Sequence, residues 1–101
     1  PSWLKALDYT ATLFKRKRKF LEPPSEVAKR HLKVSPFAGE PIGWIIENIG
    51  PDMLVYASDY PHPEGTSDPI GKFEATMTNC DEATMNAFYH GNMEELMGIK
   101  L

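Results

Sequence analysis

The feature that most constrains the fold of this sequence is the continuous apolar run Met53–Ala57, which stops abruptly at the polar segment Ser58–Gly65. The run does not alternate between apolar and polar residues, so it is typical of a strand covered on both faces, as in a parallel sheet. It is too short for most helices, and Val55 and Tyr56 favour a strand. The sequence therefore predicts a buried parallel strand whose end carries a carboxylate and an imidazole.

Helical patterns surround this run. Apolar residues spaced three or four apart, prolines at first-turn positions, and glycines just beyond the last turn mark where these helices begin and end. A second strand of about four residues is expected within Leu32–Phe37, with Pro36 at its end. The predicted helices are Ser2–Leu21, Pro24–His31, Gly39–Asn48, Ile70–Met77, a helix capped by Asp81 that carries Met85, Phe88 and Tyr89, and Asn92–Met97.

Strands that alternate with helices indicate βα units and a parallel sheet. Two strands do not form a stable sheet by themselves, whereas 101 residues are enough for one small domain. We therefore expect residues 1–101 to be a single partial domain of a larger α/β fold. The absence of a starting Met at Pro1 suits processing, a tag remnant or a piece cut from a longer protein.

Composition narrows the classes of partner. The net charge of −3 does not favour nucleic acid or an anionic membrane, and no apolar run is long enough to span a bilayer. The basic run Lys15–Lys19 suits either a nucleic-acid patch or, as we expect in an acidic chain, a solvated helix end. The single cysteine, Cys80, cannot form an internal disulfide, which fits a reducing, cytoplasmic location.

Three segments carry a family resemblance when they occur in this order: EPPSEVAKRHLKVSPF, IGWIIENIGPDMLVYASDYPHPEGTSDPIGKFE and GNMEELMGI. Together they resemble the carboxyl-terminal part of the amidohydrolase-related family, to which aminocarboxymuconate-semialdehyde decarboxylase is related. These proteins are metal-dependent hydrolases and decarboxylases on a (β/α)8 TIM barrel. The resemblance implies an α/β fold in which the two predicted strands are about the seventh and eighth of an incomplete barrel. The family's amino-terminal His-x-His pair and mid-barrel histidine belong to strands that this chain lacks.

The resemblance assigns roles to three residues of the segment after the apolar run. It implies that Asp59 binds a divalent metal, or lies beside it, and takes a proton from metal-bound water, while His62 and Ser58 serve the substrate or the loop. Zinc is the expected metal, with manganese as the alternative, and such an ion makes hydroxide available at neutral pH. Taken from the residues alone, Asp59 after Ser58 also suits an ordinary turn, because aspartate bonds to nearby backbone N–H groups.

Two functions remain open at this stage. In the first, the chain is the carboxyl-terminal fragment of an enzyme that hydrolyses or decarboxylates a small carboxylic or carbonyl substrate, and the chain alone is inactive because its metal site is incomplete. In the second, it is a non-catalytic structural module that associates with itself. The expected partner is accordingly the remainder of the barrel or a second copy, since unpaired strand edges invite pairing.

Overall fold

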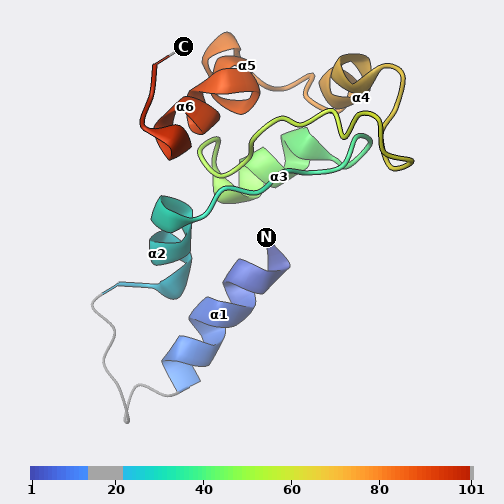
Figure 1. Ribbon diagram of the computed structural model, residues 1–101. Coiled ribbons are helices and arrows are strands. Elements are labelled where there is room, and N and C mark those ends of the chain that lie inside the picture. The colour runs from blue at the N-terminus through green and yellow to red at the C-terminus, as the bar shows by residue number, and fades with distance from the viewer. Residues whose placement is uncertain (14–21, 101) are drawn as a thin grey trace. The chain divides into compact units, whose positions relative to one another are not determined.

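The computed structural model describes residues 1–13 and 22–100, which form two compact units, Pro1–Leu32 and Lys33–Leu101 (Figure 1). The second part of the first expected helix, including Phe14, Lys15–Lys19 and Leu21, lies outside the described residues. In the first unit the helices are α1 (Ser2–Leu13) and α2 (Pro24–His31). In the second unit they are α3 (Ile42–Ile49), α4 (Pro69–Ala75), α5 (Glu82–Asn86), the π-helical turn η1 (Ala87–Gly91) and α6 (Asn92–Met97).

In the first unit, α1 packs against α2. A side chain of α1 also caps the start of α2, which has no cap from the residue before it. The residue before α2 is Pro23, which has no side-chain cap to offer. Asp8 of α1 accepts both the backbone N–H of Ser25, at 2.8 Å, and its hydroxyl, at 2.6 Å. Because the first N–H groups of a helix have no partner within the helix, this carboxylate stabilises the start of α2 from a distance in the sequence.

In the second unit, the helix ends follow local sequence signals. Asp68 accepts the N–H of Gly71 at the start of α4, and Asp81 accepts the N–H of Thr84 at the start of α5. Gly98 ends α6 with φ of 66°, in the left-handed region that favours glycine. The predicted helix at Pro24–His31, the Asp81 cap and the stop at Gly98 are therefore confirmed, whereas α3 begins at Ile42, later than predicted.

The predicted α/β fold class, with βα units of a TIM barrel, is wrong for this structure. Residues 1–13 and 22–100 contain no named strand and no sheet, and both expected strands, Leu32–Phe37 and Met53–Ala57, are extended connections. They meet at one isolated parallel bridge between Val34 and Leu54. There the N–H of Val34 donates to the carbonyl of Met53 at 2.8 Å, and that of Val55 donates to the carbonyl of Val34 at 3.0 Å.

Hydrogen bonds to helical residues explain why this pairing does not extend into a sheet. On the other side of the bridge, the side-chain amide of Asn92 donates to the carbonyl of Leu54 at 2.8 Å, and the N–H of Tyr56 donates to the carbonyl of Phe88 at 3.0 Å. A further strand could not use these groups. Pro36 has no N–H to continue the pairing from the first connection.

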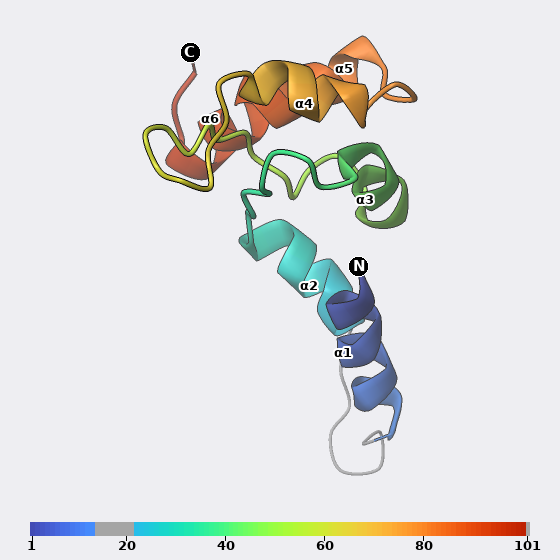
Figure 2. The same ribbon diagram turned by 90° about the vertical axis from the view of Figure 1, so that its right-hand side faces the viewer.

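The core of the second unit is a cluster of buried side chains from α3, the second connection, α4 with its following turn, and η1. Both ribbon views show α4, α5 and α6 on the same side of the extended connections (Figures 1 and 2). The members of the cluster are Ile42, Leu54, Phe73, Met77 and Phe88.

Of the described helices, none has the length and hydrophobicity needed to cross a bilayer.

The start of α3 lies close to the end of α4. The carbonyl of Thr76 accepts the N–H of Gly43 at 3.1 Å, and the Thr76 hydroxyl accepts the N–H of Ile42 at 3.2 Å. A Cβ on Gly43 would lie 2.4 Å from that carbonyl oxygen and 2.5 Å from Oδ1 of Asn79. The contact therefore requires a residue without a side chain, and it supplies partners for two first-turn N–H groups of α3.

Candidate functional site

Asp59 lies in the loop between the second extended connection and α4, and its backbone has φ of 56°. Few residue types other than glycine adopt this left-handed conformation, and aspartate is among those that tolerate it best. The side chain is half-buried. Its carboxylate has no hydrogen-bond or ion-pair partner within the described part of the chain, so it is available to a ligand.

A double turn holds the backbone on the carboxyl-terminal side of Asp59. The N–H of His62 donates to the carbonyl of Asp59 at 2.7 Å, and the N–H of Gly65 donates to the carbonyl of His62 at 2.9 Å. A Cβ on Gly65 would lie 2.9 Å from the Asp59 carbonyl oxygen and 3.0 Å from that of His62, closer than real Cβ atoms normally come. Gly65 therefore allows this close approach, and any larger residue would open the turn.

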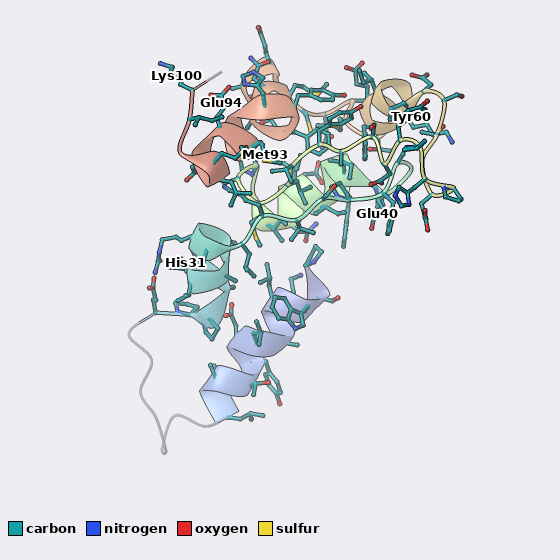
Figure 3. All side chains as sticks on the ribbon, viewed as in Figure 1. His31, Glu40, Tyr60, Met93, Glu94 and Lys100 are labelled. Carbon is teal, nitrogen blue, oxygen red and sulfur yellow. The ribbon has the colours of Figure 1, made fainter. Side chains whose placement is uncertain are left out.

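The side chain of His62 is 76% exposed, and its Nδ1 lies 3.9 Å from a carboxylate oxygen of Glu64. Ser58 acts within the same loop, where its hydroxyl accepts the N–H of Tyr60 at 3.3 Å. Tyr60, labelled in Figure 3, is 83% exposed. The loop surrounds an open depression of about 210 Å³ lined by Tyr60, Pro61, His62, Gly65, Thr66 and Ser67.

The loop does not form a complete metal site. Among the residues that the structure describes, no three His, Cys, Asp or Glu side chains are grouped so that they could hold an ion. Asp59 fits the role of one ligand, because its carboxylate is free and hard oxygen donors suit divalent ions such as zinc or manganese. His62 and Ser58 share the loop with Asp59, but Asp59 and His62 belong to no group of three or more described His, Cys, Asp or Glu side chains that could hold an ion.

Three other titratable groups of the second unit, His90, Tyr89 and Cys80, have surroundings that fit a structural role. His90 of η1 and Glu94 of α6 interact at 2.8 Å, one helical turn apart (Figure 3 labels Glu94). Burial raises the pKa of Tyr89 to about 12, assisted by the charge of nearby Glu74. Burial likewise raises the pKa of the Cys80 thiol, which makes it a poor nucleophile at neutral pH.

Sequence reasoning missed three contributors to the geometry around Asp59. Gly65 allows the double turn, while Asn92 and the Phe88 carbonyl fix the connection that leads to Asp59. The Glu-Gly pair after the histidine is a turn signal that could have identified Gly65. Phe88 contributes through its backbone, which leaves no side-chain signal in the sequence.

Comparison with solved structures relates this chain to an amidohydrolase. No protein-family model and no curated protein matches the chain. The crystal structure of an amidohydrolase from Mycobacterium avium subsp. paratuberculosis is similar over 96% of this chain, with 25% sequence identity and a TM-score of 0.79. The match covers 24% of that protein, so this chain spans about a quarter of its length. The chain is thus amidohydrolase-like over nearly all of its residues.

Proposed function

We propose that this chain is the carboxyl-terminal portion of a metal-dependent amidohydrolase-like enzyme, and that Asp59 belongs to its active site. The observation that carries the proposal is the likeness to an amidohydrolase over 96% of the chain. The free, half-buried carboxylate of Asp59 in the SDYPH segment supports it further. The cytoplasm is the proposed location, in keeping with the free thiol of Cys80.

The reaction proposed for the complete enzyme is hydrolysis of a small carboxylic or carbonyl substrate, with decarboxylation as the variant that the same metal chemistry allows. A bound zinc or manganese ion would lower the pKa of its water, to about 7 in the case of zinc. Asp59 would provide one carboxylate ligand or accept the proton of that water. His62, exposed at the rim of the loop depression, would orient a polar group of the substrate.

The isolated chain should be inactive, because a catalytic metal site needs several ligands and the described residues contain no group of three or more His, Cys, Asp or Glu side chains that could hold an ion. The remaining ligands would come from other parts of the complete protein. Isolated residues 1–101 should therefore retain little metal after dialysis, whereas the complete gene product should retain it.

The decisive experiment uses the gene product that contains this chain, assayed for bound metal and for hydrolysis of a panel of amides, esters and lactones. Asp59→Asn keeps the size of the side chain and removes its charge, and we expect activity to fall about 100-fold or more. Glu64→Gln is the matched control, since it removes a carboxylate from the same loop and should retain activity. Equal activity and equal metal content in the two variants would refute the role of Asp59.

Exposed apolar side chains favour a second candidate function, self-association without catalysis. In the second unit, Val34 is 48% exposed, Phe37 is 58% exposed and Trp44 is 54% exposed. Such side chains often mark protein interfaces when they are grouped. Sedimentation velocity of the 101-residue chain tests this function, and a monomer at all accessible concentrations excludes it.

A further inference from the structure

Asn92 is a buried polar residue whose side-chain amide donates hydrogen bonds to two backbone carbonyls. It is 4% exposed, and its Nδ2 atom donates to the carbonyl oxygen of Pro51 at 2.7 Å and to that of Leu54 at 2.8 Å. Both hydrogens of the amide are thereby used. One side chain at the start of α6 thus holds both the turn at Pro51 and the extended connection at Leu54, which leads to Asp59.

The backbone of Asn92 leads to a third hydrogen bond that anchors the same connection. The N–H of Asn92 donates to the carbonyl of Ala87, five residues earlier, which is the π-helical pattern of η1. In a regular α-helix that N–H would bond to Phe88 instead. Here the Phe88 carbonyl accepts the N–H of Tyr56 at 3.0 Å. The π-helical turn therefore makes a helix carbonyl available to the connection.

The three residues held by these hydrogen bonds, Pro51, Leu54 and Tyr56, lie close to Asp59 in the sequence. Tyr56 precedes Asp59 by three residues, a reach of roughly 10 Å at most for an extended chain. On the other side, the double turn closed by His62 and Gly65 begins at Asp59 itself. The left-handed residue thus lies between a fixed connection and a closed turn, so movement of the connection would shift its carboxylate.

We propose that Asn92 is a positioning residue, which acts with the π-helical turn η1 to fix the place of the Asp59 carboxylate. This inference rests on the proposed role of Asp59 in the active site. Asn92 does not touch the reacting groups and acts through the segment Pro51–Tyr56. π-Helical turns occur frequently at functional sites, in agreement with such a role.

The test measures amide hydrogen exchange at single residues in the 101-residue chain. Asn92→Ala removes both amide donors, and Asn92→Ser, which keeps one hydroxyl donor, replaces it if the alanine variant does not fold. The matched control is Thr76→Val, which removes a hydroxyl bonded to Ile42 and lying elsewhere in the unit. After correction for global stability, exchange at His62 should be about tenfold faster in the Asn92 variant than in the control.

The outcomes separate positioning from general stability. If exchange at His62 changes by the same factor as exchange at Phe73 in both variants, Asn92 has only a structural role and the inference is wrong. In the complete gene product, the Asn92 variant should lower kcat with little change in KM. Faster local exchange without any metal-dependent hydrolysis in the parent protein would leave the anchoring intact and refute the proposed function instead.

Discussion

Gly43→Ala provides a sharp test of the packing between α3 and α4, because two effects with opposite signs compete at this position. Alanine is about 1 kcal/mol more favourable than glycine inside a helix. In this structure, however, the new Cβ would lie 2.4 Å from the carbonyl oxygen of Thr76 and 2.5 Å from Oδ1 of Asn79. The side chain of Asn79 could rotate away, but the backbone carbonyl could not.

To relieve the contact, α3 must move from Thr76 by roughly 1 Å to reach an ordinary van der Waals distance. That movement would take the hydrogen bond from the Gly43 N–H, now 3.1 Å long, beyond the usual limit. Overpacking costs about 1–3 kcal/mol and the lost bond about 0.5–1.5 kcal/mol. After the gain in helix propensity is subtracted, the variant should be less stable by about 0.5–3.5 kcal/mol.

Urea unfolding followed by circular dichroism measures this difference. Gly91→Ala is the matched control, because Gly91 has helical backbone angles and its Cβ would meet only the Asn86 carbonyl oxygen, at an ordinary 3.6 Å. The control should be more stable than the original chain by about 0.5–1 kcal/mol. If Gly43→Ala is stabilised by a similar amount, the close contact between α3 and Thr76 does not exist in solution.

Three further predictions concern the cap of α2, the aromatic core and the partly buried Tyr89. Hydrogen bonds from Ser25 lower the pKa of Asp8. The stability that the Asp8 carboxylate contributes is therefore present above its unfolded pKa and is lost as the pH falls through the folded pKa. Asp8→Asn should remove this pH dependence of stability when unfolding is measured across an acid titration. Phe73 is fully buried, and Phe73→Ala should cost about 3–5 kcal/mol in urea unfolding, with a loss below 1 kcal/mol contradicting the core described here. Tyr89 should ionise near pH 12 in an ultraviolet titration. Because its pKa is raised in the folded state, the stability that Tyr89 contributes is fully present below its unfolded pKa and is lost as the pH rises from that value through the folded pKa. Glu74→Gln should lower the pKa of Tyr89, and an unchanged midpoint would exclude the influence of Glu74.

The helices of this chain were largely predictable because their limits depend on residues within one turn. Pro24 suits the first position of α2, and Asp81 bonds to the N–H of Thr84 three residues later. The start of α3 was placed too early, because the turn at Gly39 and Glu40 continues to Pro41 before the helix begins.

The candidate site was predictable in part. The sequence places Ser58, Asp59 and His62 in one loop, and the structure has them there. The sequence does not show that the Asp59 backbone is left-handed, or that Asp59 and His62 belong to no group of three or more possible metal ligands among the described residues. These features depend on the double turn closed at Gly65, whose geometry follows from backbone contacts rather than from residue type alone.

By itself, then, the sequence determined where the helices of the second unit end, which residues are apolar enough to form its core, and which loop carries the polar candidates. Only the tertiary structure decided that the apolar run Met53–Ala57 would not join a sheet. Its hydrogen-bonding groups meet the Phe88 carbonyl and the Asn92 amide, more than 30 residues further along the chain. Strand propensity acts locally, whereas the partner of each backbone group is set by which elements pack together, and that choice is not written in any short stretch of residues.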